Sequence, residues 1–166
     1  MKINLKKIVK EVAVTLVILF VVANVLSYLR KPTLDSNIFP ETKTVLLDGA
    51  VFNSAEAKEK PLLVHFWALW CPTCKLEAPN IQSLSKEYEV LSIVVSSGED
   101  NKVKAYMKTE GLDFRVINDK HGHWAKQFKV EAFPTTFIYD ANGTLQFTEV
   151  GYTTTVGLVT RMKILQ

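Results

Sequence analysis

The chain's only two cysteines, Cys71 and Cys74, stand three positions apart in the stretch HFWALWCPTC. They follow a continuous apolar run, 62–67, and open a segment with helical periodicity that begins at Pro72. A helix N-terminus stabilises negative charge through its free N–H groups and its dipole. The thiolate is the nucleophile in disulfide exchange, so this position favours a reactive dithiol.

A metal site and a structural staple are the other interpretations of this pair. Zinc takes about four ligands, usually from two such pairs, and the chain has no second pair. His121 and His123 could complete a set, but their spacing is not a usual ligand pattern. A bridge that closes so short a loop stabilises little. Redox use is the preferred interpretation, and the pair alone does not fix the direction of electron flow.

The N-terminus predicts a membrane anchor. Residues 12–29 read VAVTLVILFVVANVLSYL, which is 18 residues without a charge. A helix of this length spans about 27 Å, close to the thickness of a hydrocarbon core. Nothing downstream resembles the small-residue cleavage pattern of a secretory signal peptide. We therefore expect an uncleaved signal anchor.

The distribution of charge predicts the orientation of this anchor. Four lysines precede the span, and Arg30 and Lys31 follow it. The excess on the N-terminal side favours a cytoplasmic basic segment, 1–11, and a single pass through the inner membrane. The rest of the chain is then expected in the periplasm. Beyond residue 31 the chain holds 14 basic and 16 acidic residues, so no basic surface suggests nucleic-acid binding.

The remainder is expected to consist of a linker, 30–42, with two prolines, and one domain, 43–166. Apolar runs and helical periodicity alternate through that domain. Strands are predicted at 44–47, 62–67, 90–96, 113–117, 135–139 and 144–150, and helices at 72–88, 101–110, 123–128 and 154–165. This order predicts an α/β fold with a mixed central sheet and helices on both faces.

The segment 66–79, FWALWCPTCKLEAP, resembles the active site of thioredoxin-fold proteins of the membrane-anchored extracytoplasmic TlpA/ResA/DsbE type, which includes ScsD-like disulfide oxidoreductases. The resemblance covers roughly 43–166. It implies a thioredoxin fold with a TlpA-type βα insertion across 101–117. It also implies that Pro134, in the stretch FPTTF, is cis and lies against the cysteines.

Site residues follow from the same resemblance. Cys71 and Cys74 are implied to be the catalytic dithiol, and Glu77, next to them, a residue that moves protons if burial raises its pKa. Phe133 and Pro134 are implied to dock substrate, with the backbone of Phe133 pairing with a substrate strand. Trp70, beside the first cysteine, is expected on the surface that contacts partners.

Two departures from the family pattern stand out. His65 occupies the place of a buried Asp that carries protons in plain thioredoxins, and a buried His is most often a neutral packing residue. The DsbE group typically carries acidic residues around this loop and a Gly-rich insertion, whereas here the loop reads Val-Glu-Ala-Phe over 130–133, with Phe133 just before Pro134, which weakens assignment to cytochrome c maturation.

These observations predict a membrane-tethered protein disulfide oxidoreductase without a cofactor. Its expected partners are protein thiols and disulfides, together with a transmembrane electron donor of the DsbD/CcdA kind. A dedicated reductase for apocytochrome c and a copper-handling protein remain alternatives, because soft thiolates also suit Cu(I). A redox-inert structural domain is disfavoured by the intact cysteine pair.

Overall fold

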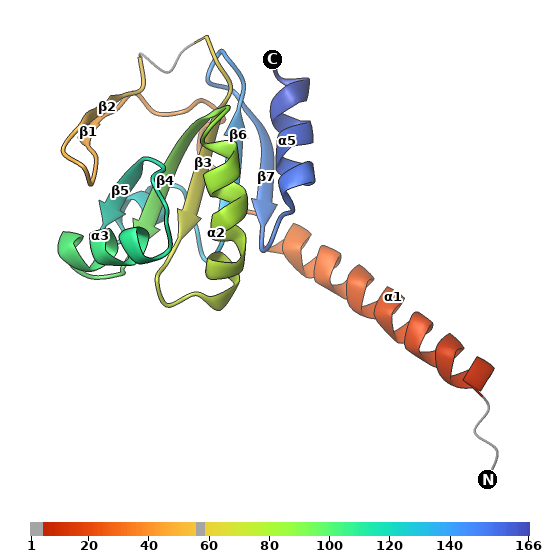
Figure 1. Cartoon of the computed structure of the whole chain (residues 1–166). Coiled ribbons are helices and arrows are strands. Elements are labelled where there is room, and N and C mark those ends of the chain that lie inside the picture. The colour runs from red at the N-terminus through yellow and green to blue at the C-terminus, as the bar shows by residue number, and fades with distance from the viewer. Residues whose placement is uncertain (1–4, 56–58) are drawn as a thin grey trace.

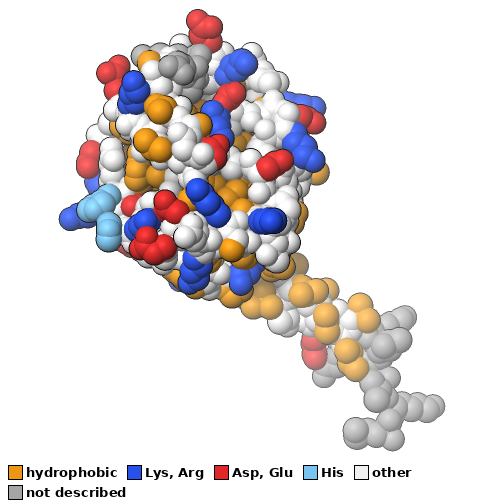
Figure 2. Space-filling model, turned by 60° about the vertical axis from the view of Figure 1, so that its left-hand side comes forward, with side chains coloured by type: hydrophobic (Ala, Val, Ile, Leu, Met, Phe, Trp, Pro, Cys, Tyr) orange, Lys and Arg blue, Asp and Glu red, His pale blue; other side chains and the backbone are white. Residues whose placement is uncertain are grey.

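The structure, a computed structural model, describes residues 5–55 and 59–166. A long helix, α1 (Leu5–Leu29), projects from an α/β body (Figure 1), and Figure 2 shows hydrophobic side chains exposed along it. Within the described ranges, Ile8–Leu29 is the one helix long and apolar enough to cross a membrane. The predicted span 12–29 lies inside this helix. Residues 1–4 of the predicted cytoplasmic segment lie outside the described residues.

The body is built on a five-stranded mixed sheet in the order β5-β4-β3-β6-β7. The central strand β3 pairs in parallel with β4 and antiparallel with β6. The strands are β3 (Leu62–Trp67), β4 (Glu89–Val95), β5 (Val116–Asp119), β6 (Thr135–Tyr139) and β7 (Leu145–Val150), and the helices are α2 (Pro72–Leu84), α3 (Asp100–Thr109), α4 (His123–Gln127) and α5 (Thr155–Ile164). This is the thioredoxin fold that the sequence predicts.

Alternation along the strands sends side chains into two apolar cores, one on each face of the sheet. On β3, Leu63 and Trp67 pack with α2, α3 and α5, while Val64 and Phe66 face α4 and the aromatic ring of Phe39. Every residue of β3 is buried. A strand covered on both faces is continuously apolar, which explains the run that the sequence displays.

Several boundaries differ from the predictions, and the helix expected at 72–88 ends at Leu84. The expected strand 44–47 is half of a hairpin formed by β1 (Lys43–Val45) and β2 (Val51–Asn53), which turns at Gly49 with a φ of 95°. The expected strand 113–117 is shifted to Val116–Asp119. Leu112 and Phe114 are apolar because they fill the core from the preceding loop, and an apolar loop of this kind resembles the start of a strand in sequence.

Part of the segment expected as a linker packs on the domain. Phe39 is buried in the core, and its N–H donates to the Gly143 carbonyl at 2.8 Å. Ile38 forms an isolated antiparallel bridge with Thr144, at the start of β7. The chain from α1 is therefore attached to the edge of the sheet before residue 43.

Candidate active site

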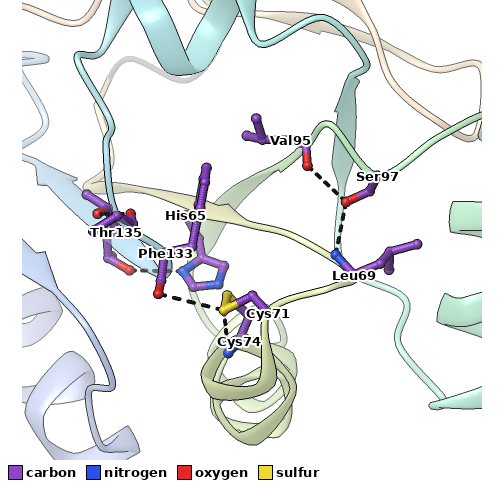
Figure 3. Close-up of a disulfide and its surroundings, with 10 residues drawn as sticks. His65, Leu69, Cys71, Cys74, Val95, Ser97, Phe133 and Thr135 are labelled. Carbon is purple, nitrogen blue, oxygen red and sulfur yellow. Dashed lines mark hydrogen bonds between the residues drawn. A yellow bond between two sulfur atoms is a disulfide. The ribbon is translucent and has the colours of Figure 1, made fainter.

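Cys71 and Cys74 form a disulfide at the N-terminus of α2, with 5.3 Å between their Cα atoms (Figure 3). Cys71 is the N-cap residue of the helix, and its Sγ accepts the N–H of Cys74 at 3.1 Å. Pro72 takes the first helical position, where a missing N–H costs nothing. The same N–H would stabilise a thiolate on Cys71 after reduction.

The loop that delivers Cys71 is held at the end of the sheet. The N–H of Leu69 donates to the Ser97 hydroxyl at 2.9 Å, and that hydroxyl donates to the Val95 carbonyl at 2.9 Å. The N–H of Cys71 donates to the Ala68 carbonyl at 3.1 Å. These contacts fix the turn between β3 and α2, and with it the position of the first sulfur (Figure 3).

The Phe133–Pro134 peptide bond is cis, as the resemblance implies. It lies beside the disulfide, because the carbonyl oxygen of Phe133 is 3.6 Å from Cys71 Sγ. The Pro134 carbonyl accepts the N–H of Gly151 at 2.8 Å, which ties this loop to the end of β7. Residues sixty positions apart in the sequence thus form one surface with the cysteines.

The two tryptophans near the cysteines have different environments. Trp67 is 1% exposed and donates its indole N–H to the Ser92 hydroxyl, so it is part of the core beneath the site. Trp70 is 60% exposed, and its ring meets that of Phe133 edge to face at 5.5 Å between centroids. Trp70 and Phe133 together flank the disulfide with an aromatic surface.

Glu77 lies on α2 one turn after Cys74, a spacing that places both side chains on one side of the helix. Its side chain is fully buried. One carboxyl oxygen, Oε1, accepts the N–H of Thr153 at 3.0 Å, and Oε2 has no hydrogen-bond partner among the described residues. Burial raises the pKa of Glu77 to about 7, against the opposing effect of the Thr153 hydrogen bond. Glu77 is therefore no solvated helix residue.

His65 lies on β3 between Leu63 and Trp67, two residues from each, and therefore faces the same side of the sheet as the cysteines. It is 2% exposed, and its Nδ1 is 2.9 Å from the Thr136 hydroxyl. Burial lowers the pKa of His65 to about 3. The imidazole is therefore neutral at physiological pH and does not titrate as the Asp of plain thioredoxins does.

Sequence reasoning missed the partners of these two groups. Thr153 contributes a backbone N–H to Glu77, and Asn80 holds the same loop through its side-chain amide, which donates to the Thr153 carbonyl at 3.0 Å. A backbone donor leaves no trace in residue type, so no sequence signal could have identified Thr153. Thr136 is detectable in principle, because it lies in the quoted FPTTF stretch.

His121 and His123 lie together, with 5.9 Å between ring centroids, and line a surface hollow with Asp100 and Lys120. The cysteines are not among the residues that line it. Across residues 5–55 and 59–166, no group of three or more His, Cys, Asp or Glu side chains is placed to hold a metal ion.

Comparison with known proteins agrees with this geometry. The Redoxin family model matches residues 34–162. The chain is 28% identical to the "Thioredoxin-like protein" of Haemophilus influenzae over 96% of this chain and 95% of that protein. It is 28% identical to "Thiol-disulfide oxidoreductase ResA" of Oceanobacillus iheyensis over 60% of this chain and 54% of that protein.

A solved structure extends the likeness. The thiol:disulfide interchange protein of the thioredoxin family from Chlorobium tepidum is 27% identical, with a TM-score of 0.70, over 80% of this chain and 98% of that one. The cysteine pair at a helix N-terminus, beside a cis-proline, stands within the matched residues. The chain belongs to the Redoxin family and is a thioredoxin-like thiol–disulfide oxidoreductase.

Proposed function

We propose that the protein reduces disulfides of other proteins on the outer side of the cytoplasmic membrane, the periplasm of a two-membrane cell, while tethered by α1. The observation that carries this proposal is the dithiol at the start of α2, with a buried carboxyl of pKa about 7 one turn further along the helix. The exposed apolar helix Ile8–Leu29 supports the tether.

The first step is attack by the reduced Cys71. Its thiolate, stabilised by the Cys74 N–H and the helix N-terminus, forms a bond to one sulfur of a substrate disulfide. The substrate S–S bond breaks, and the second substrate sulfur leaves as a thiolate that takes up a proton. The product is a mixed disulfide between Cys71 and the substrate.

The second step is release by Cys74. Its thiol loses a proton, and the thiolate attacks Cys71 Sγ, which closes the Cys71–Cys74 disulfide and expels the substrate sulfur. Two electrons have passed from the dithiol to the substrate. Glu77 is placed on the side of α2 that carries Cys74, and with a pKa of about 7 it can accept and return that proton near neutral pH.

Substrate docking is assigned to the cis-proline loop and its aromatic neighbour. An extended substrate segment would pair with the backbone at Phe133, beside Cys71 Sγ, and rest on the exposed ring of Trp70. After each cycle the disulfide must be reduced again. A dithiol protein in the same membrane, of the DsbD/CcdA kind, is the proposed donor.

The proposal is tested by trapping substrates in cells. The full chain with Cys74→Ala cannot complete the second step and should accumulate mixed disulfides on Cys71. The control variant, Cys71→Ser with Cys74→Ala, should trap nothing. Recovery of several secreted proteins supports general disulfide reduction, whereas recovery of apocytochrome c alone would replace it with a dedicated maturation role.

A further inference from the structure

The outer end of α1 and the segment that follows it are attached to the edge strand β7, each at a different end of the strand. The hydroxyl of Ser27, in the last turn of α1, donates to the Val150 carbonyl at 2.6 Å, at the end of β7. At the other end of the strand, the N–H of Leu145 donates to the Asn37 carbonyl at 2.7 Å. The segment 27–37 therefore begins at one end of β7 and reaches the other.

One attachment joins β7 to α1 itself, through Ser27, and the other joins β7 to the chain eight residues after α1, at Asn37. β7 has six residues, a length of about 20 Å at the rise of a β-strand. A third contact, the ion pair between Lys129 and Asp35, secures the same segment to the domain. The segment that connects α1 to the domain is therefore not a free linker, and the end of the sheet near Val150 stays beside the end of α1.

The depth of this contact follows from the sequence of the helix end. Ser27 belongs to the apolar span Ile8–Leu29 and precedes Arg30, the first charge after it, by three residues. At the helical rise, that separation is about 4.5 Å along the axis. Charged residues after a span lie at headgroup level. Val150 would then lie at the boundary between hydrocarbon and headgroups.

The redox site lies at the same end of the sheet. Gly151, directly after Val150, donates its N–H to the Pro134 carbonyl at 2.8 Å, and the adjoining Phe133 carbonyl is 3.6 Å from Cys71 Sγ. Figure 1 shows α1 joining the body at the end of the sheet where β3 leads into α2. A short series of contacts thus connects the membrane span with the disulfide.

Apolar and aromatic side chains are exposed on two segments that carry residues of the site, 70–77 and 152–156, which Asn80 joins through Tyr152 and Thr153. They are Trp70 (60%), Leu76 (71%), Tyr152 (52%) and Val156 (75%), and Lys75 is exposed among them. Tyr28, in the last turn of α1, is 72% exposed. Trp and Tyr are the residues favoured at the interface between lipid and water, where one part of the ring is apolar and the other wet.

We propose that this redox face, defined by Trp70, Leu76, Tyr152 and Val156, rests on the lipid surface of the membrane that holds α1. The inference depends on the tether in the proposed function and adds an orientation to it. The disulfide is then presented to thiols and disulfides held at the membrane surface, and large soluble proteins reach it less readily. The occupant of the apolar face is the lipid headgroup layer.

The test uses the full chain in vesicles of phosphatidylcholine and phosphatidylglycerol that carry a fluorescence quencher either on the headgroup or deep in the acyl chain. The headgroup quencher should reduce the tryptophan emission strongly, and the deep quencher weakly. Trp70→Phe should lose the quenchable component. Trp124→Phe is the matched control and should keep it, because Trp124 packs against Phe128 in the core on the other face of the sheet.

A second variant releases the domain without touching the redox face. A flexible Gly/Ser insertion between Lys31 and Pro32 should move Trp70 away from the quencher and weaken quenching. Reduction of insulin disulfides by the same variant, added as the soluble substrate, should be unchanged or faster. Three results would overturn the orientation: equal quenching by the headgroup quencher and the deep quencher, quenching that persists in Trp70→Phe, or no effect of the insertion on quenching.

The outcomes separate this inference from the function on which it rests. A chain that reduces insulin while its Trp70 stays unquenched is an oxidoreductase with a freely oriented domain. A chain that is quenched as expected and reduces no disulfide contradicts the proposed function alone. Recovery from cells of a chain that begins after residue 29 would remove the tether and overturn the orientation.

Discussion

Two buried titratable groups come from the two elements that meet at the cysteines, the helix α2 and the strand β3. Burial shifts their pKa values in opposite directions. Glu77 lies on α2 and His65 on β3, and neither has an ion-pair partner within the described part of the chain. Burial disfavours the charged form of each. The pKa of Glu77 therefore rises to about 7, and that of His65 falls to about 3.

The difference between these pKa values implies different roles for the two side chains. Glu77 changes its charge in the pH range in which thiols exchange, so the helix side of the site can take up and return a proton. His65 stays neutral throughout that range, so the strand β3 contributes a polar but uncharged side chain to the site. Residue type alone suggests the reverse, since free His titrates near neutrality and free Glu does not.

The largest expected effect concerns acid stability. Between pH 6.5 and pH 3 the unfolded chain binds a proton on His65 that the folded chain excludes, so stability falls as the pH falls. The loss is at most about 5 kcal/mol over this range. His65→Asn should remove that part of the loss, measured by urea unfolding of the full chain in detergent micelles at pH 7 and pH 4.

The control for this variant is His121→Asn, at an exposed position. It should leave the pH dependence of stability as in the wild type. An equally steep loss of stability in His65→Asn would show that other groups dominate the acid range.

The next effect has the opposite sign. Between pH 4.5 and pH 7 the folded chain keeps a proton on Glu77 that the unfolded chain releases, so stability falls as the pH rises. The loss is about 3 kcal/mol. Glu77→Gln keeps an oxygen for the Thr153 N–H and carries no charge. The variant should therefore be more stable than the wild type at pH 8 and similar at pH 4.5, in the same unfolding experiment.

Glu87→Gln, at an exposed position after the end of α2, is the matched control and should change stability little at either pH. If Glu77→Gln proved less stable than the wild type at pH 8, the buried carboxylate would have a favourable partner in the folded state, contrary to the account.

A kinetic effect of similar size is expected for the same substitution. Glu77→Gln removes the group proposed to exchange a proton with Cys74, and a positioned acid or base contributes about 100-fold or more. Single-turnover reduction of a disulfide-linked peptide should slow by that factor, and the inflection near pH 7 that we expect for the wild type should be absent from the variant. An unchanged profile would exclude Glu77 from proton transfer.

The smallest effect tests the sheet side. Thr136→Val removes the hydroxyl that lies 2.9 Å from His65 Nδ1 and conserves the shape of the side chain. The loss of one buried hydrogen bond costs about 1 kcal/mol at pH 7. The rate of disulfide exchange should stay at the wild-type value, since His65 takes no proton. A rate loss as large as that of Glu77→Gln would erase the distinction between the two groups.

Local pattern predicted much of this arrangement. The CPTC spacing after a buried apolar run placed the dithiol at a helix start, and the resemblance placed Pro134, whose peptide bond is cis in the structure. The strand predicted at 135–139 has the observed bounds of β6, Thr135–Tyr139. These features depend on neighbours within a few residues, or on a motif that the family shares.

What could not be predicted depends on long-range contacts. The burial of Glu77 is completed by Thr153, 76 residues away, and the attachment of α1 joins Ser27 to Val150, 123 residues away. Such contacts use backbone groups and small hydroxyls that carry no pattern. The sequence predicts the first strand of the hairpin β1–β2 but not the second. Each strand has only three residues, which is too few for alternation to show.

The most direct test of the account is a titration of both groups in one sample. Full chain in the oxidised form, with isotope labels in the Glu carboxyls and the His rings, is followed by NMR from pH 8 to pH 4. The account predicts that Glu77 titrates near pH 7 while His65 remains neutral until the protein unfolds. A Glu77 midpoint near 4.5 or a His65 midpoint near 6.5 would contradict it.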